Sequence, residues 1–184
     1  MILIAAIENH KNAEIDALCA DYVKRCGPMH SVKLELLPAA RTPDPEAQKA
    51  KESETVLKLM KPGDTLILCD ERGKTFTSRG FSTYIEKTLS QSRGKIIFAI
   101  GGAYGFTEEV RQQYPCIKLS EFVFPHHLAR LVITEQIYRA LNILKGTGVS
   151  PRLRFILAQS PAPEPAPTDF TPNSLSISYF CKIP

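Results

Sequence analysis

Short apolar runs alternate with segments of helical periodicity, and this alternation limits the fold more than any other feature of the sequence. Residues 2–7 form an apolar, β-branched run, and residues 65–69 and 95–100 form two more runs of strand length. In residues 12–25, which follow the first run, apolar side chains recur at the helical period instead. The alternation predicts an α/β fold: a mostly parallel sheet with helices on both faces.

The remaining elements are predicted from local patterns. Residues 31–37 alternate as a half-exposed strand does, and a short strand is expected near residues 117–119. Asp44 should cap a helix that runs to Lys61; with few apolar residues before Val56, this helix should be a solvated arm. Residues 70–74 should form a loop, Ser78 and Thr107 should cap two helices, and residues 126–145 should form the last one.

Length and composition favour one soluble domain. The chain has 184 residues, and no apolar run reaches the roughly 18 residues that a membrane helix needs. Its five cysteines are odd in number, scattered and without a C-x-x-C pair, which argues against a disulfide framework and a zinc site. We therefore expect reduced thiols, a cytoplasmic protein, no metal and no membrane partner. The net charge of +4 permits an RNA partner without requiring one.

A glycine-rich segment follows the run at 95–100. Gly101 and Gly102 begin it and Gly105 ends it, so backbone can approach a ligand with no Cβ in the way. The other interpretation is a simple strand-to-helix turn. The segment is not G-x-G-x-x-G and no Walker lysine follows, so neither a dinucleotide site nor a P-loop is predicted.

Polar residues near the start of the last helix are the candidates for chemistry. His126 follows Pro125, and Arg130 lies one turn further along on the same face, an arrangement that suits phosphate. The alternatives are a capping or surface histidine, and a buried salt bridge from Arg130 or Arg139 to Glu135.

Two residues after the run at 65–69 also have competing interpretations. Asp70 is either a base or hydroxyl acceptor, or a solvated loop acid. Cys69 is expected to be a small core residue rather than a nucleophile, since no electropositive setting is evident. The last helix is apolar nearly all round, which predicts burial on more than one side, with the second side against another subunit.

Several short segments, in order from residue 1 to about 146, carry a resemblance to one enzyme family. They are Gly27-Pro28, Arg72-Gly73-Lys74, Ile100-Gly-Gly-Ala-Tyr-Gly-Phe106, Phe124-Pro-His126, Arg130, Glu135-Gln-Ile-Tyr-Arg-Ala140 and Lys145-Gly146. In these segments the chain resembles the SPOUT-class methyltransferases that act on pseudouridine in large-subunit ribosomal RNA.

The resemblance implies methyl transfer from S-adenosylmethionine to ring nitrogen 3 of a pseudouridine, on the large ribosomal subunit or the assembled ribosome. It also implies a C-terminal trefoil knot and a homodimer formed through the knot. The polar groups expected nearest the target base are His126, Arg130 and Glu135. The residues expected to hold the cofactor are Cys69, Gly101, Gly102, Leu119, Ser120, Glu121, Phe122, Val123 and Phe124.

The chain departs from the family after residue 146. Residues 147–184 hold seven of the 14 prolines and should form a Pro-rich, disordered tail after a single domain at 1–146. The resemblance would place Tyr-His-His where residues 149–152 read Val-Ser-Pro-Arg. Suitable codons for these four residues encode Tyr-His-His when the reading frame is shifted by one base. Translation of the tail out of frame is therefore the rival explanation. This departure keeps two alternatives open: a non-catalytic ribosome-binding or assembly protein of the same fold, and a knotted methyltransferase directed at transfer RNA.

Overall fold

The computed structural model describes residues 1–9 and 12–146, in which strands and helices alternate as predicted. The strands are β1 (Ile2–Ile7), β2 (Val32–Leu37), β3 (Thr65–Lys74), β4 (Ile96–Ile100) and β5 (Cys116–Ile117). The helices are α1 (Ala13–Cys26), α2 (Pro45–Leu57), α3 (Ser78–Gln91), α4 (Glu108–Gln113) and α5 (His126–Leu144). The tail predicted at 147–184 lies outside the described residues, so it and the domain boundary stay predictions.

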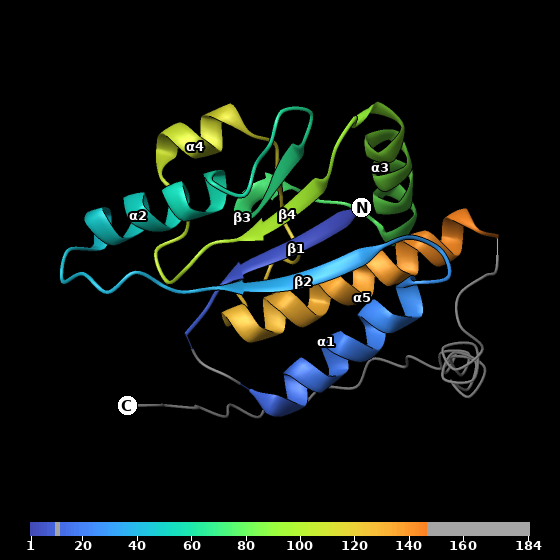
Figure 1. Cartoon of the computed structure of the whole chain (residues 1–184), viewed down its shortest axis with the longest axis horizontal. Helices are drawn as coiled ribbons and strands as arrows, with labels where there is room; N and C mark the ends of the chain where they lie inside the picture. Colours follow the sequence, from blue (N-terminus) through green and yellow to red (C-terminus); the bar gives the residue numbers. More distant parts are fainter. Residues whose placement is uncertain (10–11, 147–184) are drawn as a thin grey trace, which may run out of the picture. The chain divides into compact units, whose positions relative to one another are not determined.

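The five strands form one parallel sheet in the order β2-β1-β4-β3-β5. Helices cover both faces: α1, α3 and α5 pack on one, and α2 and α4 on the other, as Figure 1 shows. The predicted α/β class with a parallel sheet is confirmed. All the strands run the same way, so their carboxyl ends meet at one edge of the sheet.

The central strand β1 is buried on both sides, which explains its unbroken apolar sequence. Ile2 and Ile4 face the cluster that contains Ile133 of α5, whereas the alternate side chains join the cluster that contains Val56 of α2. The sheet is therefore the middle layer between two apolar cores.

Strand β3 is longer than predicted. The charged residues 70–74 were expected to form a loop, but β3 continues through Lys74 and pairs with β5 on both sides of a register shift between Cys69 and Lys74. A Cβ built on Gly73 would lie 2.5 Å from the nitrogen of Ile117 and 2.7 Å from the carbonyl carbon of Cys116. Because a side chain at 73 would collide with this backbone, the glycine lets β5 approach and extends the strand.

Helix α2 is not a solvated arm, and it ends at Leu57 rather than Lys61. Glu52, Ser53 and Val56 are all at most 2% exposed, and Val56 belongs to the core on that face of the sheet. The helix was misjudged because two of the three residues on its buried face are polar. Asp44 does cap it, as predicted, with carboxylate oxygens that accept from the backbone nitrogens of Glu46 and Ala47.

Helix α3 is capped by Thr77 rather than by Ser78. The Thr77 hydroxyl accepts from the backbone nitrogen of Gly80 at 3.1 Å, which satisfies one of the free donors of the first turn. Thr107 caps α4 in the same way, through the nitrogen of Val110, as the sequence predicted.

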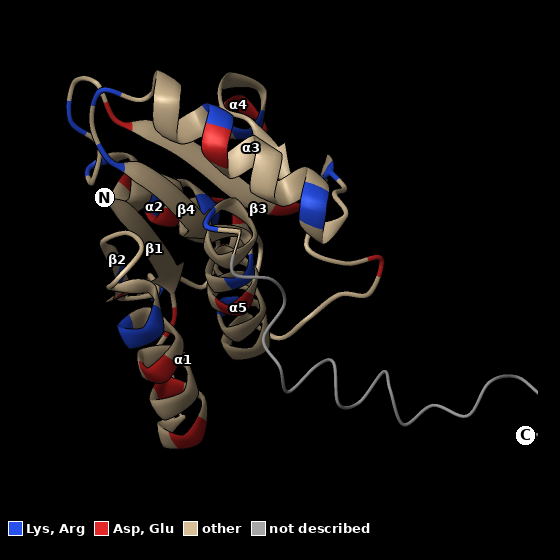
Figure 2. Cartoon of the chain, turned by 90° about the vertical axis from the view of Figure 1, so that its right-hand side faces the viewer, with Lys and Arg blue, Asp and Glu red and all other residues tan. Residues whose placement is uncertain are grey.

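One face of α5 is buried within the chain, whereas Leu128 is 37% exposed and Leu131 and Val132 are only partly buried, so the expected second buried side stays a prediction. The helix packs against α1, α3 and the sheet, and its inward side chains Ile133 and Ile137 are fully buried. Helix α1, by contrast, is mostly exposed and carries acidic residues near its start and basic residues at its end, as Figure 2 shows. No helix among residues 1–9 and 12–146 is long and apolar enough to cross a membrane.

Candidate functional site

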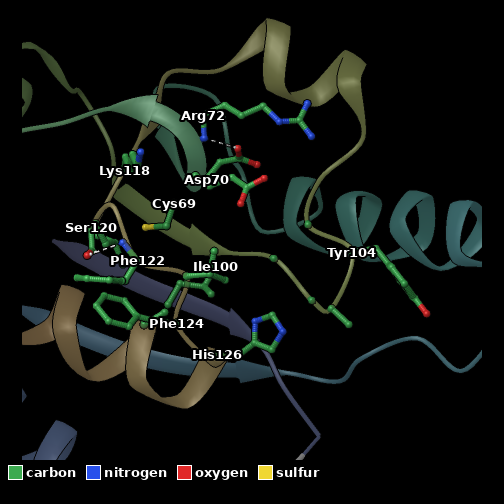
Figure 3. Close-up of a pocket in the computed structure, with 18 of the residues that line it drawn as sticks. Cys69, Asp70, Arg72, Ile100, Tyr104, Lys118, Ser120, Phe122, Phe124 and His126 are labelled. Atoms are coloured by element: carbon green, nitrogen blue, oxygen red, sulfur yellow. Dashed lines mark hydrogen bonds between the residues drawn. The ribbon is translucent and has the colours of Figure 1, made fainter. Parts of the chain in front are cut away.

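A cavity of about 290 Å³ opens at the carboxyl edge of the sheet, where β4 ends beside the irregular part of β3 (Figure 3). Its lining comes from segments far apart in the sequence: residues 69–72, 100–105, 118–120 and 122–124, with Arg111, His126 and Ala129. The volume is close to that of small-molecule sites, which begin at about 300 Å³. The carboxyl edge of a parallel sheet is also where α/β proteins usually bind ligands.

The cavity collects nearly all the residues predicted to hold a cofactor. Cys69, Gly101, Gly102, Leu119, Ser120, Phe122, Val123 and Phe124 all line it. Glu121 does not: its side chain is exposed, and its carboxylate pairs with Lys118 at 2.5 Å. His126 also lines the cavity, at the first turn of α5.

Arg130, which was expected near the target base, does not line the cavity. Its side chain is fully buried, and its Nη2 lies 2.6 Å from Asp16 Oδ1 and 3.6 Å from Glu8 Oε2. The arginine thus joins α5 to the first turn of α1 and to the residue after β1. Arg130 does form a buried salt bridge, but with Asp16 and Glu8 rather than with the expected Glu135.

Glu135 does not line the cavity either. Its carboxylate pairs with Arg139 one turn further along α5, which is the salt bridge that the sequence left open. It also accepts a hydrogen bond from Gln136 at 2.5 Å.

The glycine segment forms a tight turn with bare backbone at the cavity wall. Gly105 has a φ of +71°, and its nitrogen donates to the carbonyl of Gly102 at 2.8 Å. A Cβ on Gly101 would lie 3.0 Å from the Cα of Gly105, so the turn closes this tightly only without a side chain there. The prediction of a glycine turn that leaves backbone open to a ligand agrees with this geometry.

Asp70 and Arg111 add charge to the cavity, and Arg111 is not among the residues predicted from the sequence. The Asp70 carboxyl, only 8% exposed, accepts from the backbone nitrogen of Arg72 at 3.0 Å and lies 3.8 Å from Nη1 of Arg111. It is therefore not a solvated loop acid. Arg111 also pairs with Glu108 at 2.6 Å. The i,i+3 spacing of this pair is visible in the sequence, but the position of Arg111 at the cavity is not.

Cys69 lines the cavity (Figure 3). Desolvation by burial raises the pKa of this thiol to about 12, and the nearby Cys116 and Asp70 add to the shift. A thiol with this pKa stays protonated at neutral pH, so Cys69 does not act as a nucleophile. The sequence-based expectation for its chemistry agrees with this environment.

The mouth of the cavity carries two exposed apolar side chains. Phe122 is 82% exposed and Val123 is 80% exposed, and both lie in the segment that leads into α5. The Ser120 hydroxyl accepts from the nitrogen of Phe122 at 3.0 Å and fixes the turn that projects them (Figure 3). Within the part of the chain that the structure describes, no cluster of histidine, cysteine and acidic side chains could hold a metal ion.

Comparison with known proteins shows which family the chain matches. A family model described as "Predicted SPOUT methyltransferase" matches residues 1–148. The chain is 38% identical to "Ribosomal RNA large subunit methyltransferase H" of Christiangramia forsetii over 148 residues, 78% of this chain and 94% of that protein. The protein of the same name from Bacteroides thetaiotaomicron is 34% identical over 150 residues, 79% of this chain and 93% of that protein.

A more similar but shorter match is with the protein of the same name from Parabacteroides distasonis. It is 49% identical over 98 residues, which cover 53% of this chain and 62% of that protein.

Proposed function

Because the chain belongs to the SPOUT methyltransferase family, we propose that it transfers a methyl group from S-adenosylmethionine to ring nitrogen 3 of a pseudouridine in large-subunit ribosomal RNA. The names of its relatives support ribosomal RNA as the substrate. The proposal includes action in the cytoplasm on the large subunit or the assembled ribosome.

One observation carries the proposal: the cavity at the carboxyl edge of the sheet is lined by eight of the nine residues at which the resemblance places the cofactor. These residues come from three separate segments, and the family match covers all of them. A chance cavity would not be expected to gather them.

The lining suits S-adenosylmethionine. Ile100, Leu119 and Phe124 offer apolar surface for the flat adenine ring, and Gly101 and Gly102 expose backbone groups that can recognise its edge. When bound, this cofactor supplies a methyl group on a positively charged sulfur, which is readily attacked by nucleophiles. The protonated Cys69 thiol is a poor nucleophile, so it would not compete with the RNA for that group.

Among the three residues predicted to act on the base, His126 fits best as the group that touches it. A ring nitrogen of the uracil type attacks a methyl group only after its proton has left, so the site needs a proton acceptor or relay. The His126 imidazole lines the cavity and can take that role. Arg130 is held in ion pairs outside the cavity that join α5 to α1, and Glu135 pairs with Arg139 within α5.

The proposal extends to the trefoil knot and the homodimer that the resemblance implies. Family membership supports both, and the exposed Phe122 and Val123 support a partner surface beside the cavity. The knot would be formed by the chain around residues 116–126, which connect β5 to α5.

The test is a methyl-transfer assay with the purified full chain, tritiated S-adenosylmethionine and ribosomes from cells that lack the gene. We expect label in large-subunit RNA, and mass spectrometry should place it on a pseudouridine that is unmethylated in those cells. Label in transfer RNA alone would replace the proposal with the transfer-RNA alternative. Cofactor binding without any transfer would favour the non-catalytic ribosome-binding protein.

A further inference from the structure

The inward face of α2 carries a buried acidic residue, Glu52, that forms no ion pair within residues 1–9 and 12–146. Glu52 is 1% exposed, and its Oε1 accepts from the nitrogen of Ala40 at 3.0 Å and from Gln48 Nε2 at 2.9 Å. Its Oε2 is buried and has no hydrogen-bond partner among residues 1–9 and 12–146. A buried acceptor without a hydrogen-bond partner destabilises the folded state, so its presence here needs a physical explanation.

The free oxygen points at the glycine turn of the cavity. A Cβ built on Gly102 would lie 2.8 Å from the carboxyl carbon of Glu52 and 3.0 Å from Oε1, and it would come closest to Oε2. The carboxyl group therefore occupies the space that a side chain at 102 would fill. Gly102 lines the cavity on its other side, so the turn separates Glu52 from the ligand by one layer of backbone.

The next residue of α2 holds the other end of the same segment. Ser53 is 2% exposed, and its hydroxyl accepts from the backbone nitrogen of Thr107 at 3.2 Å. Thr107 caps α4, and the residues between 101 and 107 include the turn. Two adjacent side chains of α2 thus contact both ends of the segment that forms one wall of the cavity, and α2 lies on the same face of the sheet as α4 (Figure 1).

We propose that Glu52 is a positioning residue for cofactor binding: it supports the glycine turn from behind, and its Oε2 accepts a backbone N–H of the turn in the cofactor-bound state. Ser53 fixes the far end of the same segment. The inference rests on the proposed function, because it takes the ligand of the cavity to be S-adenosylmethionine. It assigns α2, which does not line the cavity, a direct influence on cofactor affinity.

A purely structural role predicts something different. The Glu52→Gln side chain has the same shape and keeps one oxygen to accept from Ala40 and Gln48, so packing would be conserved. It replaces the free acceptor with an NH₂ group, which cannot accept an N–H of the turn. Glu54→Gln is the matched control, since Glu54 lies on the same helix, exposed, and pairs with Lys58 at 2.9 Å.

The experiment is calorimetric titration of S-adenosylmethionine into the full chain and its variants. We expect Glu52→Gln to raise Kd about tenfold, the effect of losing one hydrogen bond to a charged acceptor, with a thermal midpoint close to that of the wild type. Ser53→Ala should raise Kd less, and Glu54→Gln should leave it unchanged. In the transfer assay Glu52→Gln should raise KM for the cofactor and keep kcat at saturation.

The failures of the two proposals look different. A wild-type chain that does not bind the cofactor defeats the proposed function and this inference with it. A wild-type chain that binds, beside a folded Glu52→Gln variant of equal Kd, defeats the inference alone. If Glu52→Gln did not fold, Ser53→Ala would decide, and an unchanged Kd in that variant would overturn the inference.

Discussion

At the scale of single residues, the cavity depends on positions where the residue has no side chain or has an unreactive one. Gly102 leaves room for the Glu52 carboxyl behind the turn, and Cys69 presents a thiol that stays neutral. Both features follow from what surrounds the residue, so neither could be derived from the residue type.

Substitution of Gly102 tests the space behind the turn. The Gly102→Ala methyl group would collide with Glu52, whose carboxyl is held by Ala40 and Gln48 and cannot swing into solvent. We expect the turn to shift into the cavity and the Kd for S-adenosylmethionine to rise at least about tenfold, as overpacking of a buried site does. Calorimetric titration measures this change in Kd.

The matched control is Gly80→Ala. Gly80 lies within helix α3, where alanine is favoured over glycine, and it is outside the cavity. An unchanged Kd in Gly102→Ala would show that the turn has slack and that the glycine is not required.

The raised pKa of Cys69 has a direct chemical consequence. A thiol with a pKa of about 12 is protonated below that pH, so at pH 8 only about one molecule in ten thousand is thiolate. We therefore expect iodoacetamide to leave Cys69 unmodified in the folded chain while it labels all five cysteines in urea. Peptide mass spectrometry follows the reaction, and rapid labelling of Cys69 in the native protein would contradict the assignment.

At the scale of elements, the order of helices and strands along the chain could be predicted, whereas the burial of polar helix faces could not. The hydrophobic pattern predicts α5 correctly because its apolar residues are numerous. It predicts a solvent-exposed α2 because Glu52 and Ser53, on the buried face, are polar. Those two residues are buried because of partners that lie 12 and 54 positions away along the chain. A local pattern does not contain such contacts.

The same limit applies to the candidate site. The residues that contribute backbone or apolar surface were identified from the resemblance, and eight of nine line the cavity. Arg130 was expected beside the base from the family resemblance. Its ion-pair partners are Glu8, which follows β1, and Asp16 in α1, and only the packing of α5 against them reveals this pairing.

Arg130 therefore provides a test of how α5 is anchored. Arg130→Met leaves Glu8 without a counter-charge in a buried setting, which should lower the free energy of unfolding by about 3 kcal/mol. This is the low end of such costs, since Asp16 is 36% exposed and can be hydrated. Urea denaturation measures the change.

Arg25→Met, which removes an exposed pair with Asp21, is the control and should change stability little. Transfer activity per folded molecule of Arg130→Met should stay within a few-fold of the wild type. A hundredfold loss of kcat without loss of stability would instead restore Arg130 as a group that touches the substrate.

At the scale of the whole molecule, the exposed apolar side chains at the mouth of the cavity bear on the proposed homodimer. Phe122 and Val123 are more than three-quarters exposed in the single chain, although the segment around them is fixed by the Ser120 turn. Large apolar side chains held in this way mark an interaction surface. Since the same segment lines the cavity, a partner subunit that covers it would also complete the site.

The proposed homodimer leads to the last prediction. Sedimentation of the purified chain should give twice its 20.5 kDa, and the double substitution Phe122→Ser with Val123→Ser should shift the equilibrium toward one chain at micromolar concentration, because it removes the apolar surface that the dimer would bury. Leu18→Ser is the control, since Leu18 is also exposed, at 48%, but lies on α1 away from the cavity. If the double variant sediments as the wild type does, the mouth of the cavity is not part of the interface, and its exposed side chains then face the RNA.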